Sequence, residues 1–312
     1  TPPIDSILYI HFKITIDSSY QTMSAPPNAY ANLIPTKGIS PTHLLKPLKE
    51  HEWRVIYFDA PNRGEQVRIL LHLVGQPFED YRMAFPHGKT PLMSISDAGD
   101  QAPMAFDLCP IVQHGEISIG IVPGCMLYIA EHFNLVPSNI NGRSLCAGLV
   151  DASEMMRDDV FYGKPIGYFN RAKARKMPGT LSHEVYHKWL GHFERFLRNK
   201  EAGNEPLLKG YDLNGPFFFG KNIYYPDISI YDTLMGIWAM DLYDLDLTKR
   251  RKRYPLLHKF VNAVSNLPGI KEYENKRGTR LDIYRKAEEA GNKRFEEKKK
   301  KENNNNNSAS KL

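Results

Sequence analysis

The chain has 312 residues and a formal net charge of +6. That length exceeds one typical domain, so we expect two domains with appendages. Much of the basic excess falls in two runs, residues 249–253 and 298–301. No nucleic-acid-binding motif accompanies these runs, and a charge run is usually a solvated face, so we expect no nucleic-acid partner.

The cysteines and the apolar runs exclude two further classes of protein. Cys109, Cys125 and Cys146 show no CxxC or metal-type spacing, which argues against a disulfide framework or a structural zinc site. No apolar run approaches the roughly 18 residues of a membrane-spanning helix. We therefore expect free thiols and no membrane span.

The two ends of the chain differ in composition from its middle. Residues 1–52 carry Pro-rich and Ser-rich patches without clean periodicity, and we interpret them as a mostly irregular N-terminal extension. The chain begins with Thr1, and Met23 is an alternative natural start. Residues 278–312 are interpreted as a charged arm followed by a disordered tail, because the asparagine tract 303–307 has nothing to bury.

The last three residues, Ser310, Lys311 and Leu312, spell the peroxisomal import tripeptide. The polar tract before them would present this tripeptide to an import receptor. We therefore expect a peroxisomal protein, with the cytoplasm as the alternative location.

From residue 53 the sequence alternates between strand and helix patterns. Residues 53–58 (WRVIYF) form a β-rich run, which precedes a polar loop and an apolar-periodic helix ending at Gly75. Strand patterns return at 78–83 and 110–115, and Pro123 then opens a helix. The order βαβ, then β, then α predicts a small thioredoxin-like α/β domain over residues 53–137.

From about residue 142 onward the apolar spacing is helical. Apolar residues recur at helical spacing around Leu149, Met155 and Met156, and then through 186–196, 230–242 and 254–267. These segments predict an all-α domain over residues 142–277.

Three motifs occur in a recognisable order along this region. Residues 56–65 (IYFDAPNRGE) are followed by 109–112 (CPIV), and then by FGK at 219–221 with SIYD at 229–232. In the last motif Ser229 could cap a helix by accepting from the N–H of Asp232 while Asp232 reaches back. The three motifs resemble the cytosolic glutathione transferase family of the tyrosine type, especially its sigma and mu classes. In that family the proline of the second motif is cis.

The resemblance implies a fold, an assembly and a chemistry. The fold is a thioredoxin-like domain followed by a helical bundle, and the assembly is usually a homodimer. The chemistry joins glutathione, as a cosubstrate, to a small apolar electrophile in detoxification, or runs related isomerase or peroxidase reactions.

Glutathione must lose its thiol proton to react, because the thiolate is the nucleophile and a free thiol has a pKa of about 8.5. By resemblance Tyr57 is the residue whose hydroxyl stabilises the thiolate, and Arg63 supplies positive charge. The backbone of Cys109, next to Pro110, would pair with the backbone of the tripeptide. Lys89, in the preceding loop, is a further binding residue by the same resemblance.

The sequence departs from the family where the γ-glutamyl group is held. The Gln/Glu-Ser pair at the start of a helix is replaced by Ile121 and Val122, or by Gly120 and Ile121 if the alignment is slipped by one residue. Pro123 also removes one backbone donor. The glutamine before the cis-proline segment is replaced by Leu108. Loss of two or three polar contacts at about 1 to 3 kcal/mol each lowers affinity by orders of magnitude. The sequence therefore leaves two readings open, a glutathione transferase with a degraded site or an inactive relative that serves as a structural protein, ligand carrier or complex subunit.

Residues 183–187 (HEVYH) spell the H-E-x-x-H pattern of zinc proteases. No third ligand stands at the expected spacing, and the segment lies inside the predicted helical domain. We interpret it as a chance match on a surface helix and predict no metal.

Overall fold

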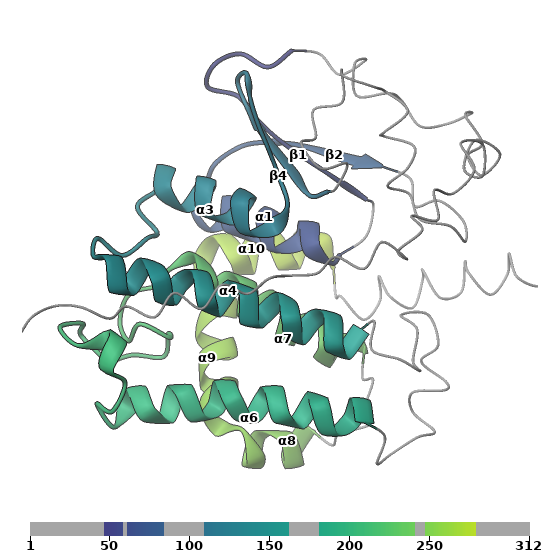
Figure 1. Cartoon of the computed structure of the whole chain (residues 1–312). Coiled ribbons are helices and arrows are strands. Elements are labelled where there is room, and N and C mark those ends of the chain that lie inside the picture. The colour runs from purple at the N-terminus through teal and green to yellow at the C-terminus, as the bar shows by residue number, and fades with distance from the viewer. Residues whose placement is uncertain (1–46, 59–60, 84–108, 162–180, 241–246, 279–312) are drawn as a thin grey trace, which may run out of the picture. The chain divides into compact units, whose positions relative to one another are not determined.

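The structure is a computed structural model, which describes residues 47–58, 61–83, 109–161, 181–240 and 247–278 (Figure 1). Lys89, Leu108 and the C-terminal tripeptide lie outside these described residues. None of the described helices is long and apolar enough to cross a membrane.

The N-terminal half contains a four-stranded mixed sheet and two helices: β1 (Trp53–Phe58), α1 (Arg63–Leu73), β2 (Glu79–Met83), β3 (Ile111–His114), β4 (Ile117–Gly120) and α3 (Val122–His132). The strand order is β2-β1-β3-β4, with β1 parallel to β2 and antiparallel to β3. All six residues of β1 are buried, as befits the strand that has neighbours on both sides. The predicted thioredoxin-like domain is confirmed.

The strand β4 was missed by the sequence analysis, which placed one β segment at 110–115. In the structure β3 turns at Gly115, whose φ of 56° suits a glycine, and β4 pairs back antiparallel to it. The sequence of β4, ISIG, alternates apolar residues with small ones, but it has only four residues, which is the shortest run in which such a pattern indicates a strand.

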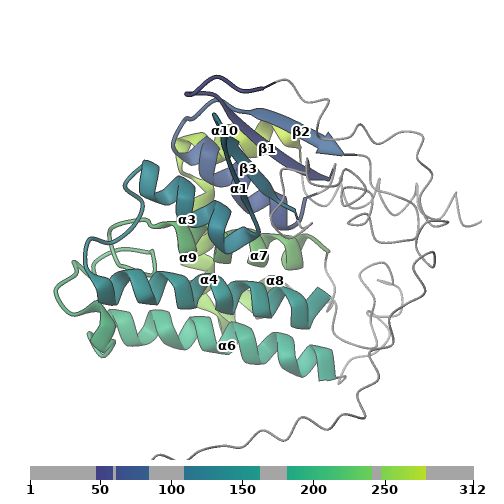
Figure 2. The ribbon, with the colours of Figure 1, turned by 45° about the horizontal axis from the view of Figure 1, so that its top comes forward.

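The C-terminal half is mainly helical in its described part, as predicted, apart from turns and two isolated β-bridges between η4 and α7. Its elements are α4 (Ile140–Phe161), α6 (Leu181–Glu201), the 3₁₀ turn η4 (Pro206–Leu208), α7 (Tyr225–Met240), α8 (Leu247–Arg253), α9 (Pro255–Ser265) and α10 (Pro268–Arg277). Figures 1 and 2 both show α4 running beside α6, and α4 also packs on α7.

One apolar core joins the two halves. Buried side chains of α1, such as Val67 and Leu70, belong to the same cluster as Leu234 of α7 and Phe260 of α9. α1 packs against α3, α7 and α10. Because α1 has neighbours in both halves, its first turn is fixed with respect to the helical half as well as to the sheet.

Helix α7 begins one turn earlier than its capping motif predicted. Tyr224 is the residue before the helix, and its N–H donates to the carboxylate of Asp227 at 2.8 Å. The same carboxylate accepts from the N–H of Phe218 at 2.9 Å. Asp227 therefore performs the reach-back half of a capping box in which a tyrosine replaces the usual serine or threonine.

The prediction that Ser229 and Asp232 form this box is wrong. Ser229 lies inside α7, and its hydroxyl has no hydrogen-bond partner among the described residues. The carboxylate of Asp232 instead pairs with the Arg157 guanidinium at 2.7 Å. The sequence favoured 229–232 because Ser229 is a usual capping residue and Tyr224 is not, whereas in the structure the helix begins at Tyr225.

Candidate functional site

Tyr57 lies near the carboxyl end of β1, where the sheet meets the first turn of α1. Its side chain is 6% exposed and packs in a small apolar cluster with Ile56, Phe58 and Ile111. Cys109 packs against the same cluster. The fold thus brings together the predicted tyrosine and the residue before Pro110, which are far apart in sequence.

A glycine determines how closely α1 approaches the tyrosine. A Cβ atom added to Gly64 would lie 2.3 Å from Cγ of Tyr57 and 2.7 Å from its Cβ. Carbon atoms in contact normally lie about 3.5 to 4.0 Å apart, so only glycine fits here. The sequence analysis did not single out Gly64, although it directly follows Arg63.

Arg63 is the first residue of α1, and two carboxylates of α4 hold its guanidinium. Its Nε donates to Glu154 at 2.7 Å, and its Nη2 pairs with Asp158. Burial acts to lower the pKa of Arg63, but the two carboxylates outweigh burial and raise the pKa above its usual range. Arg63 therefore stays charged, while its positive field is partly balanced by Glu154 and Asp158.

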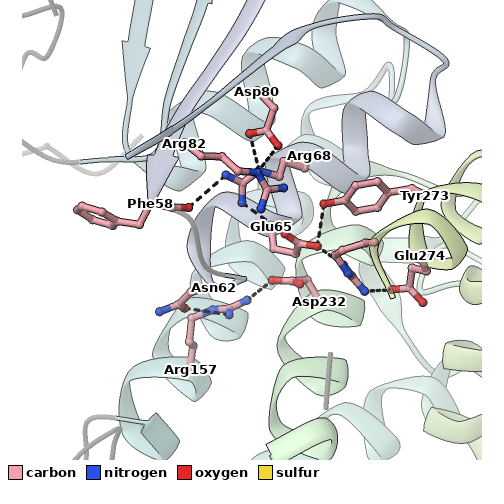
Figure 3. Close-up of polar contacts among 11 residues, drawn as sticks. Phe58, Asn62, Glu65, Arg68, Asp80, Arg82, Arg157, Asp232, Tyr273 and Glu274 are labelled. Atoms are coloured by element: carbon pink, nitrogen blue, oxygen red, sulfur yellow. Dashed lines mark hydrogen bonds and ion pairs between the residues drawn. The ribbon is translucent and has the colours of Figure 1, made fainter. Parts of the chain in front are cut away.

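A buried polar network joins α1 to the last described helix, α10 (Figure 3). The Glu65 carboxylate, 1% exposed, accepts from the Tyr273 hydroxyl at 3.0 Å and pairs with Arg277. The Arg68 guanidinium lies 3.4 Å from the same carboxylate. Two side chains of α10 thus contact the same carboxylate of α1, which holds the two helices together.

Arg68 extends this network to the strands. Its guanidinium donates to Asp80 of β2 at 2.8 Å and to the backbone oxygen of Phe58 at 3.3 Å. It also lies 5.7 Å from the ring centroid of Tyr57. The residue after the predicted catalytic tyrosine is therefore tied to α1 by a buried cation.

The loop before α1 is fixed from the opposite side by Arg157 of α4. The Arg157 guanidinium donates to Asn62 at 3.3 Å, and to Asp232 and Thr233 of α7 at 2.7 Å each. Asn62 directly precedes Arg63, so this contact helps to set where α1 begins. Figure 3 shows Asn62, Arg157 and Asp232 meeting below the first turn of α1.

The peptide bond between Cys109 and Pro110 is cis, as the resemblance predicted. Burial raises the pKa of the Cys109 thiol to about 12. The thiol is therefore protonated near neutral pH and is a poor nucleophile. Its backbone, at the start of β3, is the part suited to meeting an extended ligand.

The first turn of α3 contains the departures from the family. Ile121 has φ 67° and ψ 139°, an unusual conformation for a β-branched residue. Its N–H donates to the Pro110 oxygen at 3.0 Å, and its own oxygen accepts from the Cys125 N–H at 3.0 Å. No side chain caps α3, and Val122 is 2% exposed in the core.

This corner consequently offers a ligand only backbone donors, since Ile121 and Val122 are aliphatic and Pro123 has no N–H. A strained residue held by its neighbours suggests a functional position. The corner thus combines an unusual backbone conformation at Ile121 with apolar side chains at 121–123.

His187 of the H-E-x-x-H segment is engaged in a structural contact. Its Nδ1 lies 2.8 Å from the Tyr254 hydroxyl at the start of α9. Within the described ranges, no group of three or more His, Cys, Asp and Glu side chains is arranged to hold a metal ion.

Comparison with known proteins agrees with this architecture. The family profile described as "Glutathione S-transferase, C-terminal domain" matches residues 164–277. The glutathione S-transferase of Plasmodium falciparum (isolate 3D7) is 27% identical over 223 residues, covering 70% of this chain and 92% of that protein. Glutathione S-transferase 4 of Caenorhabditis elegans is 23% identical over 229 residues, covering 71% and 94%.

Among solved structures, a Pi-class glutathione S-transferase of Onchocerca volvulus shares the fold, with a TM-score of 0.54. It is 19% identical and is covered over 93% of its length, against 72% of this chain. A thioredoxin-like domain with a cis-proline, followed by a helical domain, defines the glutathione transferase fold. The chain is thus similar to cytosolic glutathione S-transferases over most of their length, and it shares their fold.

Proposed function

We propose that this protein binds the sulfur of glutathione at Tyr57 and adds it to small apolar electrophiles, with low affinity for the tripeptide. One observation carries the proposal. The fold holds Tyr57 against Gly64, in the same side-chain cluster as Cys109, which precedes the cis-proline.

In the proposed mechanism the Tyr57 hydroxyl donates a hydrogen bond to the glutathione thiolate. Such a charge-assisted bond favours the anion over the thiol, and the thiolate then attacks the electrophilic carbon. Arg63 adds positive charge, reduced by Glu154 and Asp158. The Cys109 backbone aligns the peptide, and Lys89 supplies a further contact from the loop before it.

The proposed affinity is low because of the α3 corner. The γ-glutamyl carboxylate would meet Ile121 and Val122 where the family provides polar side chains. Val122 would contribute only its backbone N–H, since its side chain lies in the core. Two missing hydrogen bonds to a charged group, at about 1.5 to 3 kcal/mol each, lower the affinity for glutathione by roughly a hundredfold or more.

The same corner favours a second function, that of an inactive relative acting as a structural protein, a ligand carrier or a complex subunit. Retention on glutathione resin and a chloronitrobenzene conjugation assay separate the two functions. A conjugation rate that falls in Tyr57→Phe, with the fold intact, supports the enzyme. An unchanged rate removes Tyr57 from the mechanism, and the absence of both retention and conjugation supports the inactive relative.

We further propose a sigma-like or mu-like homodimer. Three large apolar side chains are exposed on α3 and α4, namely Leu127 (41%), Ile140 (73%) and Met155 (58%). Burying them against a second copy would stabilise a dimer. Sedimentation equilibrium on the full chain and on a Met155→Glu variant tests this assembly, and a monomer in both contradicts it.

The proposed location is the peroxisome, because of Ser310, Lys311 and Leu312, with the cytoplasm as the alternative. A fluorescent protein fused to the last dozen residues tests the location. A punctate signal is expected, and a diffuse cytoplasmic signal would count against import.

A further inference from the structure

The short helix α8 presents a stripe of cations at the surface, which we call the basic stripe: Lys249, Arg251, Lys252 and Arg253. All four side chains are exposed. Helical spacing puts Lys249, Lys252 and Arg253 on one side of α8, because residues three and four apart are neighbours. Like charges so placed repel one another and destabilise the helix unless a partner neutralises them.

The cations of the basic stripe make no hydrogen bond or ion pair with the described part of the chain. Two other exposed lysines of the same half are paired, since Lys259 contacts Glu201 at 3.1 Å and Lys276 contacts Glu272 at 2.9 Å. Among the described residues, nothing therefore neutralises these four cations, which are available to an anionic partner.

The remaining basic residue of α8 anchors the helix. The Arg250 guanidinium lies 4.3 Å from the ring centroid of Trp238. His258 also stacks on Trp238, with ring centroids 4.6 Å apart and an interplanar angle of 15°. α8 also packs on α9. The basic stripe is thus held on the folded core, so that a partner can bind it without first ordering α8.

The aromatic rings next to the stripe are occupied or buried, which argues against single-stranded nucleic acid as the partner. The Trp238 ring is contacted by Arg250 and by His258, and Tyr254 is 4% exposed. Proteins that hold single strands stack bases on exposed rings. A flat array of phosphates requires only exposed charge.

We propose that the basic stripe docks the protein on an anionic phospholipid surface. Clusters of Lys and Arg on a helix are attracted to the negative surface of such a leaflet. In Figure 1, α8 lies at the edge of the helical half away from the sheet, so that docking leaves the Tyr57 region exposed to the aqueous phase. The docking is independent of whether the Tyr57 site is active.

The test is co-sedimentation of the full chain with vesicles of phosphatidylcholine, with and without phosphatidylserine. The test variant is Lys249→Gln/Arg251→Gln/Lys252→Gln, which leaves Arg250 on Trp238. The matched control is Lys209→Gln/Lys221→Gln/Lys271→Gln, which removes the same charge from exposed positions elsewhere. Circular dichroism verifies that both variants are folded.

We expect the protein to bind only vesicles that contain phosphatidylserine, and to bind them less as salt is raised. Each cation near such a surface increases the partition coefficient onto the vesicles roughly fivefold. The triple variant at 249, 251 and 252 should therefore partition roughly a hundredfold less than the native protein. The control variant should bind nearly as well as the native protein.

Equal losses in the two variants would mean that only net charge matters, which overturns the proposal. So would binding to phosphatidylcholine alone, or no binding to either vesicle. Binding to polyuridylate or polyglutamate in preference to the vesicles would assign the stripe to nucleic acid or to an acidic protein.

Discussion

Replacing Gly64 by alanine tests how the predicted catalytic tyrosine is positioned. The new Cβ would lie 2.3 Å from Cγ, 2.4 Å from Cδ1 and 2.7 Å from Cβ of Tyr57. These atoms are at the base of the side chain, so a rotation of the hydroxyl end cannot relieve the overlap. Either the Tyr57 ring or the first turn of α1 must move by about 1 Å to restore normal contact.

The expected effects follow from that displacement. Overpacking a well-packed site costs about 1 to 3 kcal/mol of stability. A misplacement of about 1 Å at a reacting centre lowers the rate by roughly a hundredfold. Gly64→Ala should therefore lose both stability and conjugating activity. Tyr57→Phe should lose activity with a smaller loss of stability, because it deletes the hydroxyl without moving the ring.

The assays are urea unfolding and the initial rate of chloronitrobenzene conjugation. Gly148→Ala is the matched control, because it lies in α4 with no atom within 4 Å of an added Cβ. This control should gain up to about 1 kcal/mol of helix stability and keep its rate. If Gly64→Ala matched Gly148→Ala in stability and rate, the close packing of α1 on Tyr57 would be refuted.

Three further predictions concern buried charges and thiols. Asp232→Ala removes the nearer of the two carboxylates that the buried Arg157 guanidinium contacts, leaving Glu154 at 3.3 Å, so urea unfolding should show a loss of about 1.5 to 3 kcal/mol, against less than about 0.5 kcal/mol for the exposed Asp151→Ala. Burial, with nearby arginines, lowers the pKa of His258 to about 4. Between about pH 6.5 and 4 the unfolded chain therefore takes up a proton that the folded chain does not, and stability should fall by about 1 to 2 kcal/mol from pH 7 to pH 5. Urea midpoints at the two pH values should differ less in His258→Phe, and equal differences would exclude His258 as the cause. The raised pKa of Cys109 should make its alkylation by iodoacetamide at pH 8 roughly a hundredfold slower than that of free cysteine. Peptide mass spectrometry measures this rate. A rate like that of free cysteine would be inconsistent with a buried thiol.

The fold was predictable where apolar periodicity is strong. The buried strand at 53–58 and the long helices carry patterns that only one kind of element satisfies. The helix α8 was not predicted, because it is short and almost wholly basic, and so has no apolar face to detect. The start of α7 was misplaced because Ser229 is a usual capping residue and Tyr224 is not.

The candidate site was predictable only in its local parts. Tyr57 and the cis bond before Pro110 are encoded within short motifs. The carboxylates that contact Arg63 come from α4, about ninety residues further along the chain, and no local sequence pattern predicts such a long-range ion pair. The closeness of Gly64 to Tyr57 likewise depends on the angle at which α1 leaves the sheet.

The central claim is that the Tyr57 hydroxyl stabilises the thiolate of bound glutathione. Titration of the ultraviolet thiolate absorbance, with the protein in excess over glutathione, measures the pKa of the bound thiol directly. We predict a pKa below the free value of about 8.5, and a shift back toward that value in Tyr57→Phe. The same pKa in both proteins, or no bound thiolate at any pH, would contradict the account.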